Sequence, residues 1–445
     1  MKNKEIKIAC VGNMNNNFFS VVRHLRNLGY SADLFLVNEV EHFKPQSDTF
    51  DLDSINNIVY EVNILNEDIL KINKRKIFSI FEDYDYIIAC GFSTAYLTYS
   101  AVNINMVIPY GSDFYELPFF ERDNSRSDYV NLQKKQIAKY QRRGIERAKD
   151  IIWDVTNDKF EKLIERFQLK GKRHYCTLPF LYTPEFSWKN AEYLRQQCLY
   201  RDEMEKLRTN FSFIAFNHIR QSWKNPVDEW SQKGNDKIFR AFSNFVKKVN
   251  ANSCLIVFEY GSDVSDSKKL VQDLGIVNNV FWFPITQRKN LMGMITYADV
   301  GIGEIGNYSW FSYGAIFEFL AMKKPVIHYR NDKLYQNRES DLYPMYDAAN
   351  EEQIYEALNQ CFLNPSEADR KAGLAYEWYI KTAIDKPLKI ITSAIDSTKP
   401  DSLKIKKRVK KFILFFQDII FYQKLLNKVN FRRELFLNRN SPKAN

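Results

Sequence analysis

Residues 297–329 read YADVGIGEIGNYSWFSYGAIFEFLAMKKPVIHY. An apolar segment leads into a turn with glycines at 301, 303, 306 and 314, and a helix pattern and a second apolar segment follow. Such a turn leaves backbone N–H groups unpaired at a helix N-terminus, which is a natural anion site. The acid inside the predicted helix, Glu318, lies about one turn from its start. The stretch therefore predicts a strand, turn and helix that bind a nucleotide diphosphate, with its phosphates on the N–H groups and its ribose on Glu318.

Both halves of the chain alternate strand and helix patterns. In the first half, three apolar segments end at glycines, namely Gly12, Gly91 and Gly111. The second half repeats this pattern, with apolar segments at 211–216, 254–260, 279–283 and 298–302. This rhythm is typical of parallel sheets with helices on both faces, in which ligands bind at the carboxyl ends of the strands.

A chain of 445 residues is too long for a single core. We predict an α/β protein with two Rossmann-like, doubly wound parallel-sheet domains that face a cleft. The expected parts are a domain at 1–195, a domain at 205–365, a helical segment at 366–399 that returns across the cleft, and a basic amphipathic helical tail at 400–445.

The 297–329 stretch resembles the donor-site signature of the GT-B glycosyltransferases, most closely family four. In that family an Ala-Asp pair, a loop, two Glu residues and an Ala-Met–Pro-Val segment follow one another. Glu318, Ala321, Pro325 and Val326 match this spacing, but Trp310 stands where the first Glu is expected. The resemblance implies a GT-B fold with the nucleotide-sugar on the second domain and the acceptor on the first. It also implies metal-independent transfer with retention of the anomeric configuration.

The resemblance further implies that Arg220 and Lys233 contact the donor phosphates, although an insertion containing Trp223 separates them. Each charge-assisted hydrogen bond to a phosphate contributes about 1.5–3 kcal/mol. The alternative is that both are ordinary surface charges and that Glu318 is a solvated helix residue. The complete set of donor-binding candidates is Arg220, Lys233, Glu318, Gly306, Ser309, Ser312 and Gly314. His218 lies beside the same loop and has a weaker claim.

The candidate catalytic residues are Asp113, Glu304 and Tyr110. Tyr110 stands where many relatives have a histidine, and Glu304 is the candidate to replace the missing Glu as an acceptor for sugar hydroxyls. If the reaction inverts instead, Asp113 or Glu116 is the expected base. On the acceptor side we expect Gly12, Asn13, Asn16 and Gly111. The alternative for Asp113 is a helix cap.

The sequence offers no metal-binding pattern. Five histidines and six cysteines lack ligand spacing, and Asp83 and Asp85 precede their strand, which places them at the wrong edge of the sheet. We therefore expect no metal and no cofactor other than the nucleotide-sugar co-substrate. The cysteines are expected to be buried free thiols in a reducing compartment.

The positive charge of the chain is concentrated in its tail. From Asp401 onward there are twelve Lys or Arg and three acids, a net +9 against +10 for the whole chain. Val409, Phe412, Ile413 and Phe416 share one face of a helix whose start is rich in lysine. This pattern predicts binding to an anionic membrane surface on the cytoplasmic side, the alternative being a helix packed on the protein itself. Because charge elsewhere is balanced, we expect no nucleic-acid partner.

The N-terminus reads as a charged lead into a strand rather than a signal peptide, and no apolar run is long enough to span a bilayer. The predicted function is hexosyl or N-acetylhexosaminyl transfer to a glycan or lipid-linked saccharide in polysaccharide biosynthesis. A nucleotide-sugar epimerase of the same fold and a non-catalytic, degenerate transferase that scaffolds a membrane complex remain as alternatives.

Overall fold

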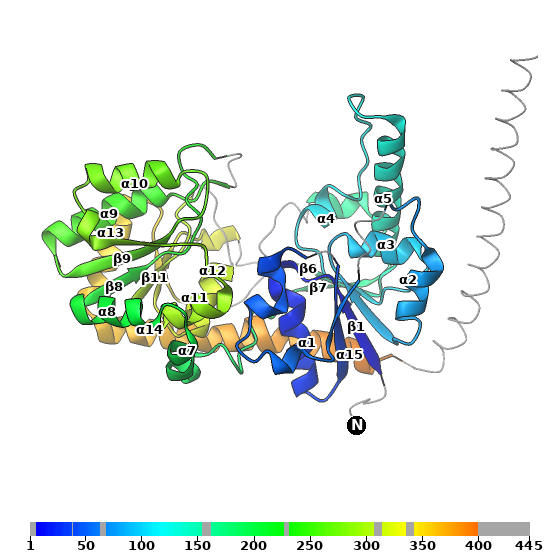
Figure 1. Ribbon diagram of the computed structural model, residues 1–445, viewed down its shortest axis with the longest axis horizontal. Helices are drawn as coiled ribbons and strands as arrows, with labels where there is room; N and C mark the ends of the chain where they lie inside the picture. The colour runs from blue at the N-terminus through cyan, green and yellow to red at the C-terminus, as the bar shows by residue number, and fades with distance from the viewer. Residues whose placement is uncertain are drawn as a thin grey trace, which may run out of the picture.

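The computed structural model describes residues 6–37, 39–62, 68–153, 162–226, 231–306, 314–334 and 342–398. Two parallel sheets form two α/β domains that lie next to each other (Figure 1). The predicted pair of Rossmann-like domains is therefore confirmed. Ser309, Ser312, Trp310 and the tail at 400–445 lie outside the described residues.

In the described part of the first domain, the sheet has the strand order β3-β2-β1-β4-β5-β6-β7, with all pairs parallel. The strands are β1 (Lys7–Val11), β2 (Ser31–Leu36), β3 (Val59–Glu61), β4 (Tyr86–Ala89), β5 (Met106–Val107), β6 (Asp150–Trp153) and β7 (Lys172–Tyr175). The α-helices are α1 (Asn17–Asn27), α2 (Lys74–Phe81), α3 (Ser93–Tyr99), α4 (Ser112–Tyr115) and α5 (Asp128–Arg147). Short 3-10 turns are η1 (Met14–Asn16), η2 (Glu41–Phe43), η3 (Pro45–Ser47), η4 (Asp53–Ile55) and η5 (Ile164–Arg166).

The second sheet has the order β10-β9-β8-β11-β12-β13 over the described residues and is also parallel. Its strands are β8 (Phe213–Phe216), β9 (Ser253–Phe258), β10 (Val280–Phe283), β11 (Val300–Ile302), β12 (Val326–His328) and β13 (Tyr346–Asp347). The helices are α7 (Ala191–Gln197), α8 (Arg201–Asn210), α9 (Asn235–Lys248), α10 (Val264–Asp273), α11 (Arg288–Ile295), α12 (Gly314–Ala321), α13 (Glu351–Leu363) and α14 (Pro365–Trp378). Further 3-10 turns are η6 (Trp188–Asn190), η8 (Val277–Asn279) and η9 (Asp332–Leu334).

Helices cover both faces of each sheet. In the second domain, α9, α10 and α13 pack on one face, and α8, α11, α12 and α14 pack on the other. The strands β8 and β9 are buried along their whole length, as expected for parallel strands between two helix layers. All six cysteines are buried free thiols, as predicted.

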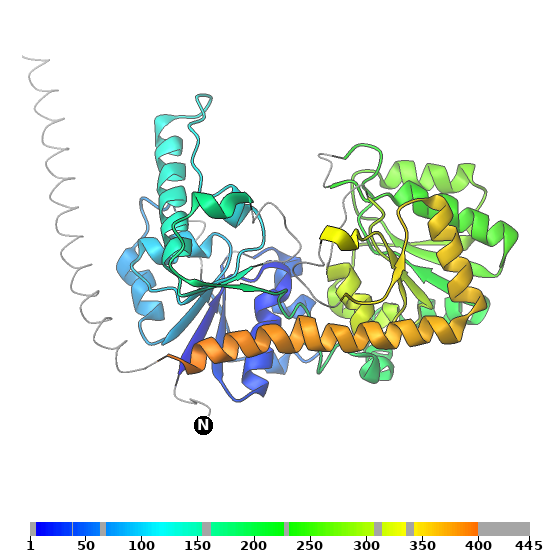
Figure 2. The same ribbon diagram turned by 180° about the vertical axis from the view of Figure 1, so that it is seen from behind.

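Two segments cross between the domains. The first contains Glu185, whose carboxylate lies 2.6 Å from the Arg23 guanidinium of α1 in a buried ion pair. The second is a helical run formed by α14, the π-helix η10 (Tyr379–Asp385) and α15 (Lys386–Asp396), which passes from the second domain to the first (Figure 2). At its end, the Tyr30 hydroxyl lies 3.0 Å from each carboxylate oxygen of Asp396.

No helix among the described residues is both long and apolar enough to cross a membrane.

Candidate functional site

The carboxyl ends of the strands in the two sheets bring the predicted residues to the junction of the domains. Glu318 lies on α12, in the turn after the helix start, and its side chain is buried. Its Oε2 is 2.7 Å from His218 Nε2, and its Oε1 is 2.9 Å from Arg288 Nε. Burial raises the pKa of Glu318, but the hydrogen bond and charge of His218, together with Arg288, outweigh it and hold the pKa below its ordinary value. Glu318 is therefore an ionised, buried carboxylate, which excludes the alternative of a solvated helix residue.

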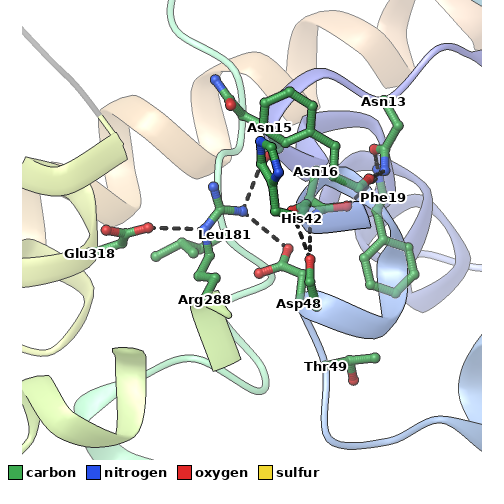
Figure 3. A network of polar contacts seen from close by, with 12 residues as sticks. Asn13, Asn15, Asn16, Phe19, His42, Asp48, Thr49, Leu181, Arg288 and Glu318 are labelled. Atoms are coloured by element: carbon green, nitrogen blue, oxygen red, sulfur yellow. Dashed lines mark hydrogen bonds and ion pairs between the residues drawn. The ribbon is translucent and has the colours of Figure 1, made fainter. Parts of the chain in front are cut away.

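Arg288 connects this carboxylate to the first domain. It begins α11, and its Nη1 donates to the Asn15 carbonyl at 2.9 Å and lies 3.2 Å from Asp48 Oδ2 (Figure 3). The guanidinium also lies over the Phe180 ring, 4.1 Å from its centroid. Sequence reasoning missed both Arg288 and Asp48, because neither belongs to a recognisable motif and their pairing joins positions 240 residues apart.

Asp48 is the buried acid of the first domain in this network. One carboxylate oxygen faces Arg288, whereas Oδ1 is buried and has no hydrogen-bond partner in the described parts of the chain. Burial raises the pKa of Asp48 to about 7, against the attraction of Arg288. The charge of Asp48 therefore depends on its burial and on the charged groups around it.

Lys233 and Glu304 form a second pair on the donor side. Lys233 Nζ lies 2.7 Å from Glu304 Oε1, while Glu304 Oε2 is buried without a partner among the residues described. The neighbouring Gly234 has a left-handed φ of 67°, and a Cβ there would lie 2.5 Å from the Ile305 carbonyl oxygen. Glycine is thus required for the two loops to touch. Gly306 is likewise buried, against the Gln232 carbonyl.

The two ends of the insertion between Arg220 and Lys233 lie next to each other. The Lys233 N–H donates to the Ser222 carbonyl at 2.6 Å, which brings the chain back to within two residues of Arg220. Arg220 is half-buried, and its guanidinium has no hydrogen-bond or ion-pair partner within the described ranges. An unpaired cation at the edge of a parallel sheet is suited to bind an anion.

Gly314, the first residue of α12, packs against the Phe180 ring. Together with Glu318 it fixes the start of the predicted donor helix beside Arg288. The predicted contacts of Ser309 and Ser312 lie outside the described residues and stay predictions.

On the first domain, Asp113 joins two glycine loops. Its carboxylate accepts hydrogen bonds from the N–H groups of Gly91 (3.0 Å), Tyr110 (3.1 Å) and Gly111 (2.9 Å). Gln141 Nε2 donates to the carbonyls of Gly91 and Asp113 beneath them. Burial raises the pKa of Asp113 to about 6 despite its backbone hydrogen bonds. Asp113 thus has a clear structural role, and its catalytic role stays a prediction.

Tyr110 is half-buried beside the same loops, and burial raises the pKa of its hydroxyl. A Cβ at Gly91, whose φ is 62°, would lie 2.7 Å from that hydroxyl oxygen. Glu116, the other candidate base, is exposed one turn beyond Asp113. Gly12 and Gly111 are buried, as the close approach of their loops requires.

Asn13 and Asn16 are buried and bonded to each other. Asn13 Nδ2 donates to Asn16 Oδ1 at 2.7 Å and to the Phe43 carbonyl at 2.6 Å, and Asn13 Oδ1 accepts from the Phe19 N–H at 3.0 Å. Asn16 Nδ2 in turn lies 3.1 Å from Ser47 Oγ. The two side chains therefore fasten the segment 39–47 to the first glycine loop, and the predicted acceptor contacts would have to come from other atoms of this loop.

An open cavity of about 620 Å³ lies beside these loops on the first domain. Its lining is rich in aromatic residues, and it includes Phe92, Tyr115, Phe119, Glu116 and Lys134. Phe92 directly follows Gly91 and is 42% exposed. This cavity offers exposed side chains on the acceptor side that a ligand could contact.

No cluster of three or more potential metal-ligating His, Cys, Asp or Glu side chains occurs in the part of the chain that the structure describes. Asp85 lies at the amino end of β4, away from the cleft edge, where its carboxylate accepts from the Lys7 N–H at 3.2 Å.

The arrangement of the two domains was compared with that of solved structures. The chain is similar to the Anabaena protein HepE, solved with UDP and glucose, at 13% identity and a TM-score of 0.56 over 88% of this chain and 100% of that one. A glycosyltransferase from Rickettsia africae aligns at 18% identity and a TM-score of 0.56, covering 89% of this chain and 100% of that one. The fold is GT-B. A UDP-GlcNAc 2-epimerase from Neisseria meningitidis bound to UDP-GlcNAc also aligns, at 13% identity and a TM-score of 0.53 over 88% of this chain and 99% of that one.

No protein-family model matches the sequence, and no curated protein matches it either. At these identities the likeness establishes the GT-B fold, and the activity has to be argued from the site.

Proposed function

We propose that this protein is a glycosyltransferase that moves a hexosyl or N-acetylhexosaminyl group from a nucleotide-sugar to a saccharide or lipid-linked saccharide. The observation that carries the proposal is Glu318, a buried carboxylate held ionised in the helix that follows the glycine turn. A buried charge of this kind is expected where it serves a ligand or a specific partner. Since HepE was solved with UDP and with UDP-glucose, uridine nucleotides are the first donors to test.

In the proposed reaction, the bond between the anomeric carbon and the diphosphate oxygen breaks, that carbon bonds to an acceptor hydroxyl oxygen, and the hydroxyl proton passes to the departing diphosphate. Negative charge then develops on the leaving diphosphate, where Arg220, Lys233 and the N–H groups of the glycine turn stabilise it. Glu304, with one carboxylate oxygen unpaired among the described residues, accepts a sugar hydroxyl. The expected stereochemistry is retention, without a metal.

If the reaction inverts instead, a base must take the proton of the acceptor hydroxyl. Asp113 is buried and holds three backbone N–H groups, whereas Glu116 is exposed next to the aromatic cavity. Glu116 is therefore the better placed of the two for direct contact with an acceptor.

The test is incubation of the purified protein with UDP-, GDP- and ADP-sugars, with and without glycan acceptors and with EDTA present. A glycosylated product that forms only with an acceptor supports the proposal. An isomerised nucleotide-sugar without acceptor would instead support the epimerase, a function favoured by the similarity to the UDP-GlcNAc 2-epimerases. If none of these nucleotide-sugars binds, the result would support the alternative of a non-catalytic scaffold protein. A ligand at 100 times its dissociation constant stabilises by about 2.7 kcal/mol, so a thermal-shift screen detects binding first.

The basic tail adds a proposal on location. Residues 401–445 carry a net charge of +9, and we propose that they hold the enzyme on the cytoplasmic face of an anionic membrane. Each Lys or Arg close to such a surface contributes about 1 kcal/mol, and salt weakens the attraction. Deletion of residues 400–445 should abolish co-sedimentation with anionic vesicles and leave donor binding unchanged. Equal sedimentation of the truncated protein would refute the proposal.

A further inference from the structure

One guanidinium lies at the contact between the two sides of the cleft. Arg288 belongs to the second domain, where its Nε lies 2.9 Å from Glu318 Oε1. Its Nη1 bonds to the first domain, at 2.9 Å from the Asn15 carbonyl oxygen and 3.2 Å from Asp48 Oδ2 (Figure 3). Asn15 belongs to the first glycine loop, on the predicted acceptor side, and Glu318 is the predicted ribose ligand.

We propose that Arg288 is a positioning residue that couples donor binding at Glu318 to the placement of the acceptor-side loop of the first domain. This inference rests on the proposed glycosyltransferase function. A donor that engages Glu318 and Arg288 fixes the guanidinium, and the fixed guanidinium holds the acceptor domain in register through Asn15 and Asp48.

The buried contact depends on the way the two domains meet in this structure. The side chains of Arg288, Asp48 and Glu318 are 13%, 2% and 7% exposed. A buried charge without its partner is costly, so the two acids depend on the one arginine that they share. Opening the cleft would separate Asp48 from Arg288, because they lie in different domains.

The network also has capacity for a ligand. Arg288 Nη2 has no hydrogen-bond partner among the residues described, and His218 Nδ1 and Asp48 Oδ1 are buried without partners there. Buried polar atoms are usually paired, so the two buried unpaired atoms beside this ion-pair network, His218 Nδ1 and Asp48 Oδ1, indicate that a polar ligand completes it. Ribose hydroxyls and phosphate oxygens are suitable partners for the guanidinium N–H groups.

The experiment compares R288A, R288K, D48N and the double variant R288A/D48N with the wild type. The control is R208K, because Arg208 pairs with Asp299 inside the second domain at 2.7 Å and leaves the cleft untouched. For each protein, calorimetry gives the dissociation constant of the nucleotide-sugar found in the screen, and initial rates give KM for the acceptor and kcat. Small-angle scattering with and without that nucleotide-sugar measures compaction.

The wild type is expected to become more compact on binding the nucleotide-sugar. R288A is expected to weaken donor binding by about tenfold and to lose this compaction, since it removes a charge-assisted contact. D48N should change donor affinity less than about threefold but raise the acceptor KM by about tenfold, because only the acceptor domain loses its contact. R288K keeps the charge but loses the planar fork, so it should behave like R288A. The double variant should match R288A in acceptor KM, since both changes break the same link.

A merely structural Arg288 would lower thermal stability without this split between donor affinity and acceptor KM, and that result would overturn the inference. Additive losses in the double variant would overturn it too. Failure of the wild type to bind any nucleotide-sugar would overturn the proposed function and the coupling together. Wild-type binding and transfer with unaltered D48N kinetics would overturn the coupling alone.

Discussion

The two sides of the cleft use their polar residues differently. On the donor side, Arg220 has no partner among the described residues, and Glu304 Oε2 and His218 Nδ1 are buried without partners there. On the acceptor side, Asn13, Asn16 and Asp113 are bonded to the backbone and to each other. The donor half thus leaves polar groups available for a ligand, whereas the acceptor half uses Asn13, Asn16 and Asp113 to hold its own loops and leaves only Asp48, among these residues, with an unpaired buried atom. The acceptor must be recognised by other groups, of which the aromatic cavity around Phe92 is the best candidate.

The largest expected effect tests the structural role of the acceptor-side asparagines. Asn13→Ala removes three side-chain hydrogen bonds and leaves buried groups unpaired, which should lower the free energy of unfolding by about 2–4 kcal/mol. The measurement is the urea midpoint and Tm, with the exposed Asn124→Ala as control, expected within about 0.5 kcal/mol of the wild type. An Asn13→Ala protein of normal stability with a raised acceptor KM would show that Asn13 is a binding residue.

The second prediction concerns Glu318 on the donor side. Glu318→Ala should raise the donor dissociation constant by tenfold or more, about 1.5–3 kcal/mol for a hydrogen bond to a charged group. Calorimetry with the nucleotide-sugar measures this, and Glu318→Gln, which keeps an acceptor atom, should lose less. The exposed Glu352→Ala controls for the loss of an acid from the domain. An unchanged donor dissociation constant in Glu318→Ala would contradict the prediction that Glu318 binds the ribose.

The third prediction separates phosphate recognition from general packing. Arg220→Ala should weaken nucleoside diphosphate binding by about tenfold and leave nucleoside binding within about twofold, because its guanidinium has no partner among the described residues and is expected to bind the phosphates. Lys233→Ala should show the same selectivity, combined with some loss of stability, since it leaves Glu304 unpaired. Arg240→Ala, on the exposed face of α9, is the matched control. Equal losses for both ligands would identify the effect as structural.

Local sequence patterns predicted the fold well because strands, glycine turns and helix starts are encoded by neighbouring residues. The apolar segment predicted to end at Gly12 contains β1 (Lys7–Val11), and the predicted stretch 297–329 contains β11, α12 and β12. The order of the motifs was enough to indicate GT-B. Local sequence patterns could not reveal which polar side chains form hydrogen bonds within the protein and which remain available for a ligand.

Asn13 and Asn16 were predicted to contact the acceptor because they follow a strand and a glycine. Their hydrogen-bond partners at Phe43 and Ser47 belong to a segment with no recognisable sequence pattern. Arg288 and Asp48 were missed for a related reason. Their contact exists only after two domains have formed and met, and no spacing in the sequence encodes it.

The last prediction concerns the charge that joins the two sides. Burial raises the pKa of Asp48 from 3.8 to about 7, with Arg288 and Arg23 opposing the shift and Glu185 and Glu318 adding to it. An acid whose pKa is higher in the folded state binds its proton more tightly there, so its protonation favours folding. The stability of the wild type relative to Asp48→Asn, which cannot titrate, should therefore fall as the pH rises from about 4 to about 7 and level off above.

The measurement is the urea midpoint of both proteins between pH 4 and pH 8, in which titrations common to both cancel. A constant difference across this range would mean that Asp48 keeps the same charge in the folded and unfolded chain. The contact across the cleft would then be a permanent ion pair. A falling difference would instead make the link between donor side and acceptor side weaker in acid, since a protonated Asp48 no longer carries the charge that attracts Arg288.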